Sequence, residues 1–352
     1  MRWAAIVSLV SIALLGTVLL VTPSAPLTIA SAAALIGGVL AAVHHAEVVA
    51  HRVGEPLGTL VLALAVTIIE AALILTMMIV GGETAAGLAR DAIYAAVMII
   101  CTGVIGLCVL VGALRHREQA FRPEGAGPAL AALATLSVIV LVLPDFTTSA
   151  PAPLYSPSQL LFTAVVSLAL WTVFIFFQTV RHRDYFLPAG RSDDGQATPP
   201  TVGEGWTAFM LLIVSLVAVV GLAKMLSPRI EDAIAVMRAP PAALGVAIAL
   251  LVMLPETVAA TRAALANRLQ TSMNLALGSA LACIGLTVPV VVAASLVLRL
   301  PLALGLDPKG IVLLSLAFLV GTITLATGRT NLMQGAVHLV LFAAFLFLTI
   351  VP

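Results

Sequence analysis

Two glutamates, Glu70 and Glu256, interrupt strongly apolar stretches of this chain. The first follows the run VTII at residues 66–69, and the second follows VMLP at residues 252–255. A carboxylate inside an apolar helix is costly unless a cation, a proton or another group compensates it. We therefore expect both glutamates to bind a cation or a proton, with a purely structural role as the alternative.

The two carboxylates together would offer a site of hard oxygen ligands. Such a site suits Ca²⁺ or Na⁺ rather than a soft metal. Without a cation, two like charges in a low-dielectric site cannot both stay ionised at low cost, so protons compete for the same oxygens. One Ca²⁺ or two protons balance the pair, and this competition is sufficient for antiport.

Residues next to each acid could complete the site. Pro255 has no N–H to donate, so it predicts a helix break that frees backbone carbonyls beside Glu256. The first helix has no proline at this place, and Thr67, one turn before Glu70, could supply a hydroxyl instead.

Polar residues on the helix that follows each acid are secondary ligand candidates. Thr102 and Ser279 lie deep enough in their apolar stretches to reach an ion at the middle of a membrane, directly or through water. Asn274 lies nearer the cytoplasmic end and could line the entrance. Tight packing of these glycine-rich helices is the competing interpretation.

Histidines form a separate set of titratable candidates. His44, His45 and His51 gather at the cytoplasmic end of the second apolar stretch, where pH sensing is one interpretation and a solvated helix end is the favoured one. His338, in the last apolar stretch, could relay protons, although a hydrogen-bonded packing role is favoured. Asp145, at the outer end of its stretch, is a weaker candidate for an exit acid.

The composition describes the scaffold that must position these residues. Apolar residues make up 61% of the chain and charged residues 9%, which indicates an all-α polytopic membrane protein rather than a soluble domain. The net charge of +1 gives no reason to expect a nucleic-acid partner, and the cysteines show no disulfide or zinc spacing. The apolar windows predict eleven membrane spans, at residues 3–22, 27–49, 57–80, 91–114, 128–144, 159–180, 206–226, 241–263, 271–298, 310–327 and 332–351.

The charges predict how these spans are oriented and divided. Of the 17 Lys and Arg residues, 11 fall on the N-terminal side and 6 on the other, which places the N-terminus in the cytoplasm and the C-terminus outside. The polar stretch 181–205 reads as a flexible cytoplasmic linker. We expect an extra N-terminal helix at 1–26, retained rather than cleaved as a signal peptide, and five-helix repeats at 27–180 and 206–352.

Matching features in the two halves predict an inverted repeat. A glycine precedes each acid by 12 or 11 residues, at Gly58 and Gly245. Each acidic helix is followed by a polar turn and a glycine-rich span. Because each repeat has an odd number of spans, the two insert in opposite directions, as in many secondary transporters whose ion site lies between the repeats.

Three segments resemble known proteins: GEPLG at 54–58, LPE at 254–256 and MNLALGS at 273–279. They look like the α-repeats of the cation/Ca²⁺ exchanger (CaCA) superfamily, and specifically its ChaA-type calcium/proton antiporter branch. The resemblance implies a ten-helix core of inverted repeats plus an extra N-terminal helix, alternating access, and Glu70 and Glu256 as the acids that bind cations and protons. The asparagines that flank these acids in many calcium/proton exchangers are missing here.

The favoured function is therefore an antiporter in the cell inner membrane that exchanges cytoplasmic Ca²⁺ for external protons. A Na⁺ or K⁺/proton antiporter using the same site is the alternative. Its expected partners are inorganic cations, protons and the lipid bilayer, with no cofactor. An intramembrane hydrolase is disfavoured because neither Glu70 nor Glu256 has a catalytic partner one helical turn away. A channel is also disfavoured, because the site can be protonated and the repeat is inverted.

Overall fold

The computed structural model describes residues 2–21, 24–53, 57–186, 200–237, 240 and 242–351. Among these residues, eleven helical segments are long and apolar enough to cross a membrane, as the sequence predicts. The contacts divide the chain into two compact units, which are described separately. Unit 1 comprises Met1–Ala85 and Ser192–Ala239, and unit 2 comprises Ala86–Arg191 and Pro240–Pro352.

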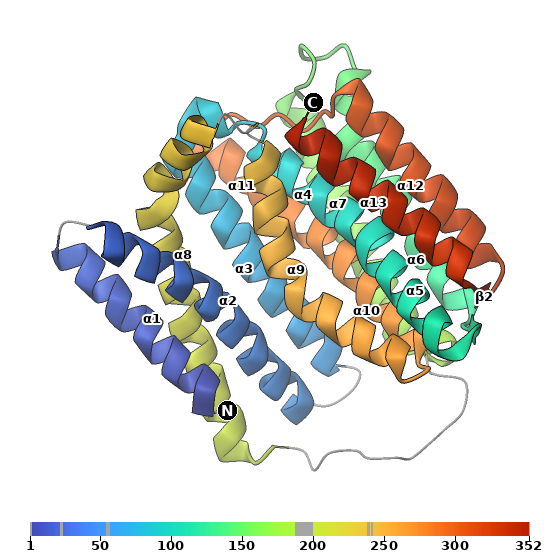
Figure 1. The fold of residues 1–352 in the computed structure, drawn as a ribbon. Coiled ribbons are helices and arrows are strands. Elements are labelled where there is room, and N and C mark those ends of the chain that lie inside the picture. Colours follow the sequence, from blue (N-terminus) through green and yellow to red (C-terminus); the bar gives the residue numbers. More distant parts are fainter. Residues whose placement is uncertain are drawn as a thin grey trace. The chain divides into compact units, whose positions relative to one another are not determined.

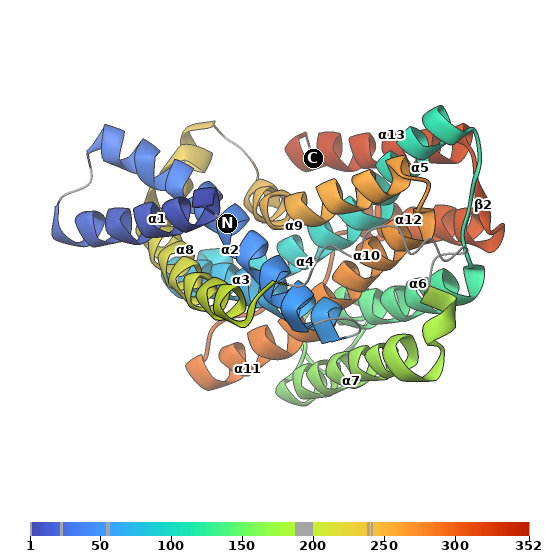
Figure 2. The same ribbon diagram turned by 90° about the horizontal axis from the view of Figure 1, so that it is seen from below.

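Unit 1 is a bundle in which α2 packs against α1, α3 and α8 (Figures 1 and 2). Small residues let these helices approach closely: a Cβ added to Gly38 would lie 3.1 Å from a methyl group of Val219. The Ser11 hydroxyl also donates a hydrogen bond to the Ala34 carbonyl (3.0 Å). The elements of unit 1 are α1 (Arg2–Leu20), α2 (Ala25–Val53), α3 (Leu57–Gly81), the 3₁₀ turn η1 (Gly82–Ala85) and α8 (Val202–Met237).

Unit 2 contains the other spans and a two-stranded antiparallel pairing of β1 with β2. Its first part comprises α4 (Leu88–Met98), η2 (Ile99–Val104), α5 (Ile105–His116), β1 (Gln119–Ala120), α6 (Pro123–Ser137), η3 (Val138–Val142), η4 (Leu143–Asp145), α7 (Pro157–Phe176), η5 (Phe177–Arg181) and η6 (Arg183–Phe186). Its second part comprises α9 (Ala242–Leu265), α10 (Leu269–Ala282), η7 (Cys283–Thr287), α11 (Val288–Leu298), α12 (Pro308–Ala326), β2 (Arg329–Thr330) and α13 (Leu332–Ile350).

Both glycine-rich spans of unit 2 contain a π-helical segment near the middle, η2 in one and η7 in the other. A π-helical turn widens the helix and is frequent at functional sites. Thr102 lies within η2, whereas Ser279 lies in α10, one turn before η7 begins.

Hydrogen bonds show that these two spans run in opposite directions. The Ala303 amide, just after α11, donates to the Ala86 carbonyl, just before α4, over 2.9 Å. At the other end, an imidazole nitrogen of His116, the last residue of α5, lies 2.9 Å from the carbonyl oxygen of Leu265, just before α10. The start of each span therefore lies beside the end of the other.

The pair α6 and α12 shows the same inversion. The Phe121 amide before α6 donates to the Gly328 carbonyl after α12 (3.0 Å). The Leu306 amide before α12 donates to the Leu141 carbonyl in η3, which continues α6 (2.9 Å). Unit 2 by itself thus contains two antiparallel pairs of corresponding spans, as an inverted repeat requires.

Both ends of the predicted linker 181–205 are helical in the structure. Residues 183–186 form η6, and α8 begins at Val202. Residues 187–199 lie outside the described part of the chain, as do residues 54–56 of the GEPLG segment. Each compact unit contains parts of both predicted repeats, so the repeat boundaries stay a prediction about sequence rather than about packing.

Candidate functional site

In unit 1, α3 holds Glu70 on a buried face. The Glu70 side chain is 1% exposed, and Thr67, one turn earlier, is 4% exposed. Ile74, one turn later, is fully buried, whereas Ile68 on the opposite face is 46% exposed. Residues three and four positions apart share a helix face, so the pattern turns Glu70 and Thr67 inward together. The sequence-predicted acid and its hydroxyl neighbour are thus on the same side of α3.

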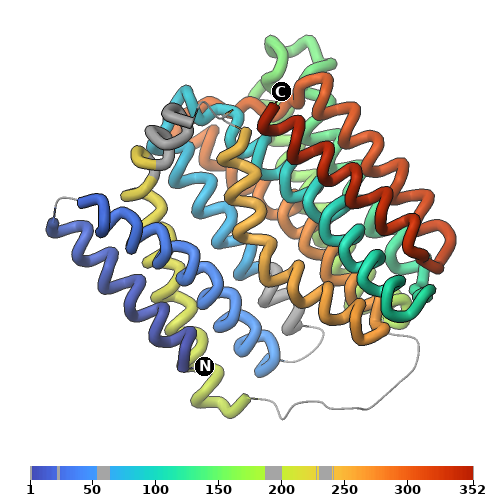
Figure 3. The backbone as a smooth tube through the Cα atoms, in the orientation of Figure 1, coloured from blue at the N-terminus to red at the C-terminus, as the bar shows by residue number. Residues whose placement is uncertain are grey.

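In unit 2, α9 holds Glu256 in a more open setting. Glu256 is partly exposed, while Val252 and Met253 in the preceding turn are buried. The predicted helix break at Pro255 is wrong, because α9 is helical without interruption from Ala242 to Leu265. The helix bends instead, as its change of direction in Figure 3 shows. Pro255 cannot donate to the Leu251 carbonyl, and such a missing bond is a common cause of a bend.

Ser279 on α10 is the secondary candidate that contacts the helix of Glu256. Its hydroxyl lies 3.7 Å from the sulfur of Met253, and Met253 precedes Glu256 by three residues. Thr102 is fully buried in η2, and its hydroxyl donates to the Met98 carbonyl of its own helix (2.5 Å). Thr102 could therefore offer an ion only its remaining lone pair, whereas the hydroxyl of Ser279 has a weak partner.

Asn274 is engaged at the other end of α10. Its amide nitrogen donates to the Phe186 carbonyl (2.6 Å), and its amide oxygen accepts from the Gln270 side chain (2.9 Å). The Gln270 oxygen in turn accepts from the Arg122 amide (2.6 Å). Asn274 thus ties the short helix η6, at the start of the linker, to α10. The sequence reasoning missed Gln270, whose only signal is its spacing of four residues from Asn274.

The histidine cluster of unit 1 is split between buried and exposed positions. His45 is 1% exposed, and its Nε2 lies 3.2 Å from the hydroxyl of Ser8 on α1. That hydroxyl contacts Ser215 on α8 (2.7 Å), so the interpretation as a solvated helix end is wrong for His45. His44 packs against the Trp3 ring, and His51 is exposed at the end of α2.

His338 on α13 is fully buried and hydrogen-bonded through both ring nitrogens. Nδ1 lies 2.8 Å from the Cys101 carbonyl in η2, and Nε2 lies 3.0 Å from the Thr324 hydroxyl on α12. Because a carbonyl can only accept, Nδ1 carries the proton in the neutral ring, and Thr324 can donate to Nε2. These bonds join α13 to η2 and to α12, which agrees with the predicted packing role.

The structure therefore brings several predicted residues together within unit 2. Glu256, Ser279 and Thr102 lie on α9, α10 and η2, which pack against one another. Glu70 and Thr67 share a face of α3 in unit 1. That the two glutamates meet at one ion stays a prediction.

Comparisons with known proteins identify relatives along nearly the whole chain. The family model described as sodium/calcium exchanger protein matches residues 23–180 and 207–351, one match in each half. The protein y4hA of Sinorhizobium fredii is 49% identical over 94% of this chain and 90% of its own length. The sodium-potassium/proton antiporter ChaA of Escherichia coli is 36% identical over 89% of this chain and 85% of its own.

A solved structure shares the fold at low sequence identity. The H⁺/Ca²⁺ exchanger CAX superposes with a TM-score of 0.75 and 14% identity, covering 98% of this chain and 87% of that one. The likeness in fold, together with the two family matches, agrees with the repeats that the sequence predicts.

Proposed function

This chain belongs to the sodium/calcium exchanger protein family, and from that premise we propose that it is a multi-pass membrane antiporter that exchanges a cation for protons. The family match covers both halves of the chain, and two relatives above 30% identity cover most of it. Transport, rather than catalysis of a reaction, is the activity of this family.

Glu70 and Glu256 are the proposed binding groups for the cation and the protons. The observation that carries this assignment is the burial of Glu70, a residue that is 1% exposed on an inward face of an apolar helix. A carboxyl in such a place is stable when protonated or when bound to a cation, and it is costly when ionised alone. Glu256 occupies the corresponding place in the second half of the sequence.

Ca²⁺ is the first proposed cargo. Two carboxylates balance one Ca²⁺, and carboxylate, hydroxyl and carbonyl oxygens are the ligands that this ion prefers. Thr67 and Ser279 are the proposed hydroxyl ligands. The antiporter would move Ca²⁺ out of the cytoplasm as external protons enter, with the N-terminus in the cytoplasm and the C-terminus outside, in the cell inner membrane.

Exchange of Na⁺ or K⁺ for protons is the second candidate function. It is favoured by the similarity to ChaA, which is named as a sodium-potassium/proton antiporter. The segments around the two glutamates also have no amide side chains, so the sites offer fewer neutral oxygens than a Ca²⁺ site commonly uses.

Inside-out membrane vesicles with an internal acid load test both candidates. A pH-sensitive dye reports proton efflux as Ca²⁺, Na⁺ and K⁺ are added in turn, with Mg²⁺ as a divalent control. The Ca²⁺ proposal predicts collapse of the proton gradient by Ca²⁺ at lower concentration than by Na⁺ or K⁺. A gradient that responds to Na⁺ or K⁺ but not to Ca²⁺ would replace the first candidate by the second. No response to any cation would exclude both.

A further inference from the structure

A pocket of about 710 Å³ lies at the end of unit 2 where α4 and α12 begin. Its charged lining residues come from three separated parts of the chain: Arg90 on α4, Asp145 at the end of η4 and Asp307 before α12. The charge pattern of the sequence predicts that this end faces outward.

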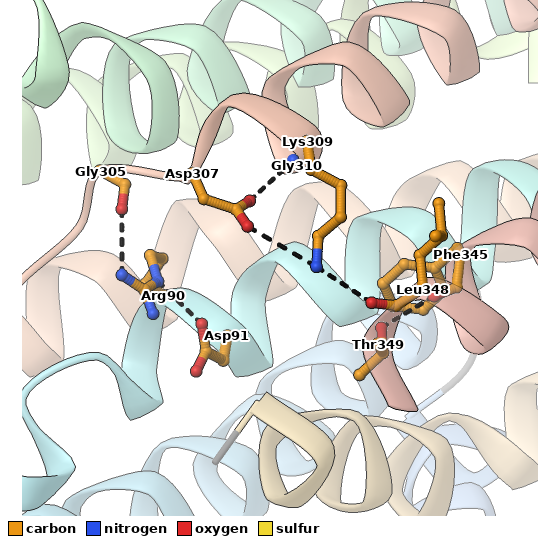
Figure 4. A network of polar contacts seen from close by, with 9 residues as sticks. All are labelled: Arg90, Asp91, Gly305, Asp307, Lys309, Gly310, Phe345, Leu348 and Thr349. Atoms are coloured by element: carbon orange, nitrogen blue, oxygen red, sulfur yellow. Dashed lines mark hydrogen bonds and ion pairs between the residues drawn. The ribbon is translucent and has the colours of Figure 1, made fainter. Parts of the chain in front are cut away.

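Backbone and side-chain contacts fix the Arg90 guanidinium at the edge of the pocket (Figure 4). Its Nε donates to the Asp91 carboxylate (2.8 Å), and Nη1 donates to the Gly305 carbonyl (3.1 Å). Gly87 leaves room for the guanidinium in this position, because a Cβ added there would lie 2.7 Å from Nη2. The guanidinium is therefore held in one place rather than mobile in solvent.

Asp145 lies against the same loop as Arg90. Gly305 leaves room for the Asp145 carboxyl in this position, since a Cβ added there would overlap both of its oxygens unless the side chain moved. Its Oδ2 is shielded from solvent and has no hydrogen-bond partner within the described residues. The Asp145 carboxyl also accepts a hydrogen bond from the Leu306 backbone and is attracted by the Arg90 charge, while its Oδ2 faces the pocket end without a hydrogen-bond partner of its own among the described residues.

Asp307 caps α12 and is partly balanced by Lys309. Its Oδ1 accepts from the Gly310 amide (2.8 Å), and its Oδ2 lies 3.6 Å from the Lys309 amine. That amine donates to the Leu348 carbonyl at the end of α13 (3.0 Å). Lys309 is therefore directed toward α13, and Arg90 is the cation among the described residues that line the pocket.

The balance of charge at this mouth depends on Arg90. A group of carboxylates in a hollow attracts cations and raises their local concentration. An exporter must release its cation where the external concentration is high, so an uncompensated acidic mouth would oppose release. A guanidinium stays protonated at every physiological pH, so it offsets these acids under all conditions of exchange.

We propose that Arg90 is a positioning residue that lowers the affinity of the outer mouth for the transported cation and so favours its release. This inference rests on the proposed antiport function, on the predicted outward direction of this end and on the premise that the cation leaves past this pocket. The Arg90 guanidinium offsets the Asp91 carboxylate to which it is bonded and also acts on Asp145, so its removal leaves the pocket with more negative charge.

Purified protein in liposomes, with exchange measured separately from each face, tests this role. Arg90→Gln removes the charge, and we expect the half-saturating cation concentration at the outer face to fall about threefold to tenfold, the range for a partly buried charge. The value at the cytoplasmic face should stay as in the wild type. Arg90→Lys keeps the charge and should stay near wild type at both faces.

Two further variants separate charge from packing. Arg299→Gln removes a positive charge from an exposed residue after α11, at the same end of unit 2, and should leave both faces unchanged. Adding Asp307→Asn to Arg90→Gln should move the outer value back toward wild type, because the net charge is restored.

The response of the two faces to the Arg90 variants tests the proposed role. The inference is overturned if Arg90→Gln leaves the outer value unchanged or shifts both faces equally. It is also overturned if Arg90→Gln and Arg90→Lys both abolish exchange, since that result indicates a packing role. Failure of the antiport proposal looks different, because the wild type itself would then move no protons in response to any cation.

Discussion

The two acidic helices, α3 and α9, present their glutamates in different surroundings. Glu70 is almost fully buried on α3 in unit 1, with Thr67 on the same face. Glu256 is partly exposed on the bent helix α9 in unit 2, where Ser279 of α10 contacts the preceding turn. Two acids at matching places in a repeat have therefore acquired unlike neighbours.

The difference in burial predicts different roles for Glu70 and Glu256 in the exchange cycle. A nearly buried carboxyl is most sensitive to losing its compensating proton or cation, because water cannot stabilise its charge. Glu256 lies beside a helix bend and is partly exposed as a residue, although its Oε2 is shielded from solvent, so we expect its ligand to exchange with solvent more readily than that of Glu70. We expect Glu70 to tolerate less change of geometry than Glu256, although both are required.

Removing either charge should have the largest effect. Glu70→Gln and Glu256→Gln keep the size and polarity of the side chain but cannot balance a cation or release a proton. We expect exchange to fall at least about 100-fold, as when one partner of a desolvated charge pair is removed. Vesicle exchange assays at matched expression measure this loss. Exchange near the wild-type rate in either variant would remove that glutamate from the site.

Shortening each acid should reveal the difference between the helices. Glu70→Asp withdraws the carboxyl within a packed face, and we expect a loss of about tenfold or more, as for a displacement of roughly 1 Å at a catalytic group. Glu256→Asp should cost less, because its partly open setting lets water or a shifted ligand fill the gap. Equal losses, measured as half-saturating concentrations for the cation, would mean that burial does not distinguish the two acids.

Restoring the missing N–H on α9 should have a smaller effect. Pro255→Ala lets the residue 255 amide donate to the Leu251 carbonyl, which should straighten the helix. The Leu251 oxygen is then less available as a ligand for the cation. We expect about a threefold weaker apparent affinity for the cation, the range of one hydrogen bond. The matched change on α3, Ile69→Ala, tests side-chain loss without a change in backbone bonding. An unchanged affinity in Pro255→Ala would exclude a role for the bend.

His338 should contribute to stability rather than to transport. His338→Gln can donate to the Cys101 carbonyl and accept from Thr324, so exchange should stay within about twofold of wild type. His338→Ala loses both bonds, so we expect its free energy of unfolding to fall by ~2 kcal/mol. Thermal unfolding of the purified protein would show this as a lower midpoint temperature. Loss of exchange in a stably folded His338→Gln protein would instead identify His338 as a proton relay.

Much of this fold could be predicted from the sequence because its signals are local. Apolar length defines the spans, and the repeated acids Glu70 and Glu256 stand out because buried carboxylates are rare. The predicted eleven spans match the described helices closely. Glycine-rich companion spans were also expected, although the π-helical segments within them were not, since no residue type specifies them.

The remaining features depend on contacts that leave no mark in the local sequence. Arg90 with Gly305, Asn274 with Phe186, and His338 with Cys101 each join a side chain to a distant backbone carbonyl. Every residue has a carbonyl, so nothing in the sequence singles out these three. The break at Pro255 was predicted wrongly because a packed membrane helix can bend around a missing bond without unwinding.

The central claim is that protons and the cation compete for the same two carboxyls, and proton release on cation binding tests it most directly. Purified protein in detergent at weak buffering is titrated with Ca²⁺, or with Na⁺ if the vesicle assay selects it, while a pH dye records released protons. The wild type should acidify the solution saturably, and Glu70→Gln and Glu256→Gln should each release far fewer protons. Undiminished release from either variant, or cation binding by the wild type without release, would contradict the claim.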